Sequence, residues 1–187
     1  MKLIKNIVIL AFIASIFTAC SETEDPVVIN EEEVITTVRA TLVPQNGGTE
    51  ITLESIDLDG DGPNAPVISV SGNFDANTTY DATLKILNET ESPADDITLE
   101  ILEEDEEHQF FFSFTNAIAT ATYNDQDSNG DPIGVEFSLL TGTANTGSFT
   151  ITLRHEPNKS ADNVSAGNIT NAGGETDVQV TFEITVN

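Results

Sequence analysis

One segment of this sequence has the residue types and the spacing of a calcium site. Asp125-Gln126-Asp127-Ser128-Asn129-Gly130 is followed, after five residues, by Glu136. An EF-hand loop places oxygen ligands at this spacing, so that they surround one calcium ion. The candidate calcium ligands are Asp125, Asp127, Asn129, Asp131 and Glu136.

The flanks of this segment leave a second interpretation open. Residues 119–123 and 135–140 read as strands, whereas an EF-hand has a helix on each side. Asn129-Gly130 is a typical hairpin turn, and Glu136 would then be an outward-facing strand residue. The segment therefore predicts either a calcium loop or an ordinary hairpin.

A second acidic loop repeats the first half of the calcium pattern with Asp57, Asp59 and Asp61. Position 12 of this loop is Ile68, which cannot bind a metal ion. The loop is either a calcium site completed by residues from elsewhere or a solvated acidic turn.

The two histidines are the other candidates for metal binding. His108 follows Glu107 and His155 precedes Glu156, and each histidine stands at the end of a predicted strand. Two imidazoles with carboxylates suit Zn²⁺ or Cu²⁺. The alternative is that both are ordinary strand-end histidines, because sequence does not show whether they meet.

Enzyme motifs do not stand out. The sequence contains no Gly-x-Ser-x-Gly or His-Glu-x-x-His pattern and no glycine-rich phosphate loop. We therefore expect a binding or structural protein rather than an enzyme, with calcium as the candidate cofactor.

The N-terminus indicates export. Lys2 and Lys5 precede an uncharged apolar run, residues 7–17, that is too short to span a bilayer. The run ends at Thr18-Ala19-Cys20, which resembles the lipobox of bacterial lipoproteins, with Phe17 where the family usually has leucine. The resemblance implies that Cys20 is diacylated and becomes the first residue of the mature chain. The alternative is an ordinary signal peptide.

Residues 21–26 form an acidic run that resembles the surface-export signal of Bacteroidetes lipoproteins. The resemblance implies a lipid-anchored protein of the outer membrane, displayed on the cell surface. The alternative is that residues 21–26 are an acidic, solvated tether without a role in surface export. We expect a signal peptide at 1–19, an acidic tether at 20–32 and one domain at 33–187.

Charge excludes one class of partner. Loss of Lys2 and Lys5 leaves four basic residues beside 32 acidic ones, a net charge near −28. Such a chain repels phosphate backbones, so nucleic-acid binding is excluded. Cys20 is the only cysteine, so no intrachain disulfide stabilises the fold.

Alternating apolar and polar residues predict short strands separated by turns. In 92–107, the alternation of Ile97, Leu99 and Ile101 suits a strand, whereas Ser92-Pro93-Ala94-Asp95 suits a helix start. The start signal favours a short acidic helix there. The chain is thus predicted to be all-β, a single antiparallel, immunoglobulin-like sandwich of eight to nine strands, with a β-barrel as the alternative. The predicted strands lie within 34–43, 49–58, 67–70, 80–86, 108–123, 135–139, 149–153 and 178–186.

Three segments, at 30–38, 107–112 and 153–159, resemble small flavobacterial lipoproteins of unknown role. Members are often labelled as a type 1 periplasmic-binding-fold superfamily, which implies alternating strands and helices. The resemblance implies no activity.

Two functions fit these observations. The first is a lipid-anchored surface domain that binds a ligand or captures a metal, beside an outer-membrane transporter. The second is a structural or adhesive surface domain that calcium makes rigid. A spatial cluster of His108 and His155 would favour the first.

Overall fold

A computed structural model of the protein describes residues 33–60 and 62–187. The predicted signal peptide, the lipidation site Cys20, the acidic tether and Asp61 lie outside these described residues. None of the helices in the described part of the chain is long and apolar enough to cross a membrane.

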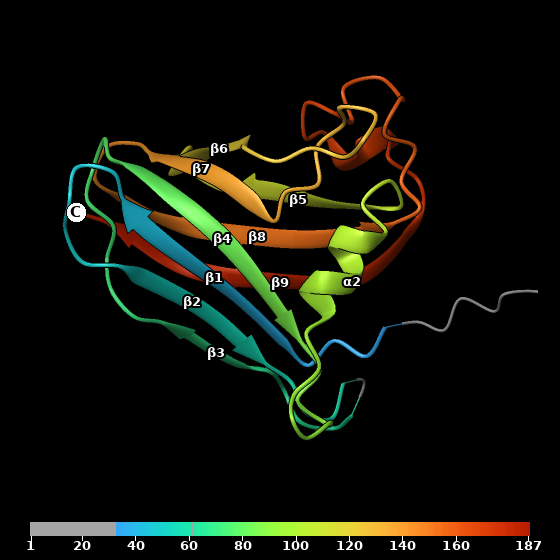
Figure 1. Ribbon diagram of the computed structural model, residues 1–187. Coiled ribbons are helices and arrows are strands. Elements are labelled where there is room, and N and C mark those ends of the chain that lie inside the picture. Colours follow the sequence, from blue (N-terminus) through green and yellow to red (C-terminus); the bar gives the residue numbers. More distant parts are fainter. Residues whose placement is uncertain (1–32, 61) are drawn as a thin grey trace, which may run out of the picture. The chain divides into compact units, whose positions relative to one another are not determined.

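The described strands form two separate antiparallel sheets rather than a closed barrel, which confirms the predicted all-β sandwich (Figure 1). The larger sheet has the order β3 (Val67–Val70), β2 (Ile51–Ile56), β1 (Thr37–Pro44), β4 (Thr79–Leu87), β7 (Glu136–Thr141) and β6 (Ala119–Tyr123). The smaller sheet has the order β5 (His108–Phe114), β8 (Asn145–His155) and β9 (Glu175–Val186).

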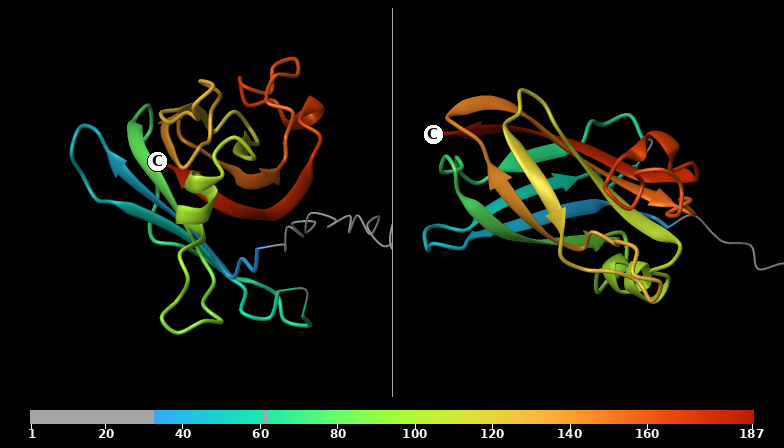
Figure 2. Two further views of the ribbon diagram at one scale, coloured as in Figure 1. Left: turned by 45° about the vertical axis from the view of Figure 1, so that its right-hand side comes forward. Right: turned by 90° about the horizontal axis from the view of Figure 1, so that it is seen from above.

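The core lies between the two sheets, which Figure 2 shows as facing layers. Side chains along a strand alternate between its two faces, so every second residue points into this space, and these residues are mostly apolar. Leu42 and Phe137 of the larger sheet pack in one cluster with Ile151 and Phe182 of the smaller sheet, all of them fully buried. Burying each such side chain contributes roughly 1.5–3 kcal/mol, which replaces the stability that a disulfide would supply.

The predicted short acidic helix is present as α2 (Ile97–Glu103), but its start differs from the prediction. Asp95 exchanges two backbone hydrogen bonds with Asn88, both of 3.0 Å, and these hold the chain extended before the helix. Thr98 then docks the helix on β4, because its hydroxyl accepts from the N–H of Ile86 at 2.8 Å. Asp96, rather than Ser92, is therefore the N-cap residue.

The polar segment after β8 covers the outer face of the smaller sheet. It contains the short 3-10 helix η1 (Ile169–Asn171). Val164 and Ala172 pack on Phe111, whose side chain points away from the main core as the alternation in β5 predicts. The described chain contains a single α-helix, so it lacks the alternating strands and helices that the superfamily label implies.

Candidate metal centre

The two histidines meet at one end of the smaller sheet. His108 begins β5 and His155 ends β8, and the two residues are direct partners in the β5–β8 ladder. Their ring centroids lie 4.7 Å apart. The antiparallel register thus brings together two imidazoles that are distant in sequence.

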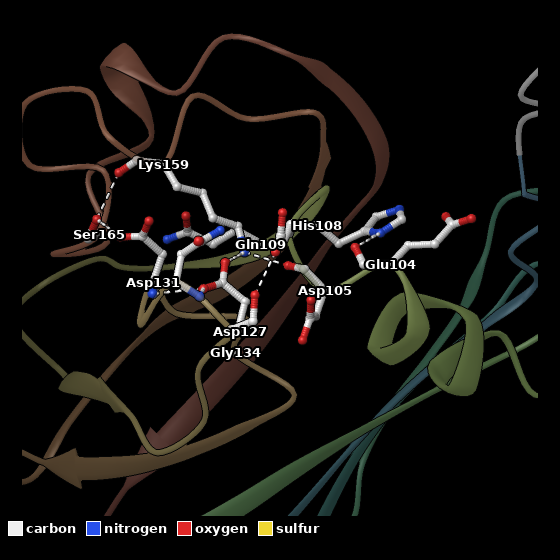
Figure 3. A network of polar contacts seen from close by, with 12 residues as sticks. Glu104, Asp105, His108, Gln109, Asp127, Asp131, Gly134, Lys159 and Ser165 are labelled. Carbon is white, nitrogen blue, oxygen red and sulfur yellow. Dashed lines mark hydrogen bonds and ion pairs between the residues drawn. The ribbon is translucent and has the colours of Figure 1, made fainter.

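His108 is fixed by a hydrogen bond from one ring nitrogen. Its Nδ1 lies 3.1 Å from the backbone oxygen of Glu104, at the end of α2 (Figure 3). A carbonyl oxygen only accepts hydrogen bonds, so Nδ1 carries the hydrogen and Nε2 presents a lone pair. Metal-binding histidines are commonly oriented by a hydrogen bond of this kind.

The second nitrogen of His108 is buried without a hydrogen-bond partner among the described residues. The side chain is fully buried, and Nε2 is 4.0 Å from the nearest carboxylate oxygen, that of Glu33. Burial, as the largest cause, lowers the pKa of His108, which keeps the ring neutral. An unsatisfied buried nitrogen costs about 1–3 kcal/mol, and a metal ion would satisfy it.

A β-bulge places Asp177 beside the histidines. Leu153 pairs with Val178 and Arg154 pairs with Thr176, so Asp177 is the extra residue on β9. Bulges redirect a side chain, and here an Asp177 oxygen lies 3.9 Å from Nδ1 of His155.

Among the described residues, three groups have ligand atoms that lie within 4.8 Å of one another. We call the first the inner group. It consists of His108, His155 and Asp177. A second group shares His108 with Glu33 and Glu104, and the third shares His155 with Glu107 and Glu156.

Negative charge gathers around the two rings. Burial, followed by the charges of Glu100, Asp177 and Glu104, raises the pKa of Glu33 to about 7. The neighbouring carboxylates thus disfavour the ionised form of half-buried Glu33, and a divalent cation beside it would relieve that repulsion.

The donor set of the inner group suits borderline transition metals. Neutral imidazole nitrogens with one or two carboxylate oxygens are typical ligands of Zn²⁺ and its neighbours in the first row. Calcium prefers six to eight oxygens and takes imidazole poorly. The inner group offers three ligands, which is the number of protein ligands in a zinc site whose fourth position is left to water.

The predicted calcium loop uses its carboxylates in another way. Asp127 is buried and accepts hydrogen bonds from the backbone N–H groups of Asn129 and Asp131, both at 2.9 Å. Lys159 also donates to Asp127 at 2.9 Å, so an ammonium group lies beside this carboxylate (Figure 3). Although burial raises the pKa of Asp127, the bond from Lys159 and those from the backbone hold it below its usual value.

The remaining candidates of this loop are also engaged in hydrogen bonds. Asp125 accepts from the backbone N–H groups of Gly134 and Glu136, at 2.7 and 2.8 Å. Asp131 accepts from the hydroxyl of Ser165 at 2.7 Å. These bonds shape the loop without requiring an ion, and the calcium site stays a prediction.

In the acidic loop that follows β2, a carboxylate is also engaged in a hydrogen bond. Asp59 is fully exposed and accepts from the side-chain amide of Asn64 at 2.7 Å. Asp57 follows the end of β2, and Asp61 lies outside the described residues. The described part of this loop brings no histidine or further carboxylate into a ligand group.

Sequence reasoning found the histidines but missed Glu33, Glu104 and Asp177. Glu33 stands at the predicted start of the domain, and its approach to His108 depends on how the chain enters β1. Asp177 stands directly before the predicted strand at 178–186, where it looks like an ordinary polar residue. The carboxylates beside the two histidines were the one available signal, and both of them, Glu107 and Glu156, lie near His155.

Comparisons of the chain with protein-family profiles, with curated proteins and with solved structures gave no match.

Proposed function

We propose that this chain is a lipid-anchored surface domain that captures a divalent transition-metal ion at His108, His155 and Asp177. One observation carries the proposal: the Nε2 atom of His108 is buried, presents a lone pair and has no hydrogen-bond partner among the described residues. A buried nitrogen in that state is costly unless a ligand occupies it.

The surroundings support a cation as that ligand. Carboxylate oxygens of Glu33 and Asp177 lie 4.0 Å from Nε2 of His108 and 3.9 Å from Nδ1 of His155. The strongly acidic chain attracts cations to its surface, which raises the rate of capture. The lipobox at Cys20 and the acidic run behind it support display on the cell surface, where the domain would supply metal to an outer-membrane transporter.

The alternative, a structural domain that calcium makes rigid, has less support. Its main site would use carboxylates that already accept backbone N–H groups and the Lys159 ammonium. The inner group instead offers nitrogen ligands.

Competition among metals tests the proposal. The purified protein is freed of metal with a chelator, incubated with equal amounts of Zn²⁺, Mn²⁺, Ca²⁺ and Mg²⁺, desalted, and analysed for its elements. We expect about one zinc ion per chain. Asp177→Asn should lose it, whereas Asp81→Asn, the same change at an exposed position of β4, should keep it.

Two results would contradict the proposal. Retention of calcium in place of zinc would favour the structural alternative. Retention of no metal by the wild-type protein would remove metal capture altogether.

A further inference from the structure

His155 faces carboxylates on two sides. Its Nδ1 lies 3.9 Å from Asp177, within the inner group, and its Nε2 lies 3.8 Å from Glu107. Glu107, His155 and Glu156 together form the third ligand group, which we call the outer group. The ring of His155 thus lies between the two groups, with Nδ1 facing Asp177 and Nε2 facing Glu107.

Exposure falls steadily from the outer group to the inner one. The Glu107 side chain is 54% exposed, His155 is 19% exposed, Asp177 is 13% exposed and His108 is 0% exposed. Solvent does not reach Nε2 of His108. A hydrated cation therefore meets the outer carboxylates before it meets the inner nitrogen.

The backbone holds the outer group in place. The N–H of Glu156 donates to the backbone oxygen of Glu107 at 2.7 Å, which joins the end of β8 to the start of β5. Glu156 has a φ of 48°, a left-handed conformation that is uncommon for a residue with a side chain. Gly174 packs against this turn, and a Cβ atom there would lie 2.1 Å from the oxygen of His155.

We propose that Glu107 and Glu156 form the entry site of the metal centre, and this inference rests on the proposed function. The exposed carboxylates of Glu107 and Glu156 first hold the hydrated ion, while His155 keeps its ring hydrogen on Nε2, the nitrogen that faces Glu107. Nδ1 of His155 then has the lone pair, so the ion loses water and moves to this nitrogen, where Asp177 and His108 replace the lost water ligands. Dividing dehydration into two steps lowers the barrier for entry into a buried site.

Binding kinetics distinguish an entry site from the other roles that Glu107 and Glu156 could have. Zn²⁺ binding to the metal-free protein is followed by stopped flow, and release is followed with a chromogenic chelator in excess. The variant is Glu107→Gln with Glu156→Gln. The control is Glu50→Gln with Glu183→Gln, which removes the same charge at exposed positions in the β1–β2 connection and in the distal half of β9.

We expect the entry variant to bind zinc about tenfold more slowly than the control, within the range of steering effects. The rate at which the variant releases zinc should fall by the same factor. An entry site lowers the barrier between free and bound ion, and this barrier governs both binding and release. The dissociation constant and the stoichiometry of one ion per chain should be unchanged.

Three results would overturn the inference. Rates equal to those of the control would mean that the outer group takes no part in entry. Faster release with weaker affinity would mean that Glu107 only orients His155. Two ions per wild-type chain and one per variant chain would make the outer group a second resting site. If the wild-type protein binds no zinc, the proposed function itself fails, which is a distinct result.

Discussion

His108 and His155 face each other across the β5–β8 ladder, with their ring centroids 4.7 Å apart. The ring of His108 is fixed from the α2 side by the Glu104 carbonyl, and the ring of His155 lies between Asp177 and Glu107. This pair links the fold to the proposed function, because the sheet register and the end of α2 together position the two histidines that are proposed to bind the metal ion.

The raised pKa of Glu33 predicts how the stability of the metal-free protein depends on pH. Between about 4.5, its ordinary value, and about 7, folded Glu33 keeps a proton that the unfolded chain has released. Unfolding then releases a proton, so the contribution of Glu33 to the free energy of unfolding falls as pH rises through this window. Glu33→Gln should therefore gain stability relative to the wild-type protein between pH 5 and pH 8.

Urea denaturation at both pH values, with a chelator present, measures this gain. Glu183→Gln, at an exposed position of β9, is the control and should follow the wild-type protein. The same pH dependence in Glu33→Gln and in the wild-type protein would contradict the prediction.

The buried ion pair of Lys159 and Asp127 should contribute more to stability than the exposed pair of Lys85 and Asp96. Lys159→Met leaves a buried carboxylate without its cation, which typically costs about 3–5 kcal/mol. Lys85→Met removes a half-exposed pair that is worth about 1 kcal/mol or less. Chemical denaturation of both variants measures how far each substitution lowers the free energy of unfolding. Equal losses would show that Lys159 does not stabilise the loops that it joins.

Calcium should not stabilise the protein beyond the effect of ionic strength. A calcium loop with a dissociation constant of about 10⁻⁴ to 10⁻³ M would add about 1.4–2.7 kcal/mol at 10 mM calcium. We expect no such gain, because Asp125 and Asp127 are occupied by N–H groups and by Lys159. Melting in CaCl₂ and in NaCl of equal ionic strength tests this. A calcium-specific rise that Asp125→Asn abolishes would establish the loop as a calcium site.

Lipidation of Cys20 predicts the behaviour of the protein in cell fractions. Cys20→Ser removes the sulfur that would carry the diacyl group, so the variant should leave the membrane fraction. Sedimentation of membranes followed by immunoblotting tests this. Continued pelleting of the variant with membranes would refute the anchor.

Local pattern was sufficient to predict the fold class and most strands, but not the break within 108–123. This segment was predicted as one strand, whereas the structure has β5 in the smaller sheet and β6 in the larger one. The alternation that separates Phe110 from Phe111 in β5 correctly assigns them to opposite faces of the sheet. The helix start was wrong because the pairing of Asp95 with Asn88, a tertiary contact, overrides the local start signal.

The candidate site was harder to predict because it depends on pairing between distant segments. Two-residue periodicity does not reveal that β5 pairs with β8, nor that a bulge turns Asp177 toward His155. The spacing of Asp125 and Asp127 fits calcium ligands, but short acidic side chains in turns also accept backbone N–H groups. Lys159, the partner that separates these interpretations, comes from a different loop.

The central claim is that Nε2 of His108 binds the metal ion, and NMR of ¹⁵N-labelled imidazoles tests it most directly. In the metal-free protein, His108 should be the Nδ1–H tautomer, with Nε2 unprotonated. One equivalent of ¹¹³Cd²⁺, a spin-active substitute for zinc, should shift the Nε2 resonance of His108 and split it by coupling to the metal. An Nε2–H tautomer, or an Nε2 resonance that cadmium leaves unchanged, would contradict the account.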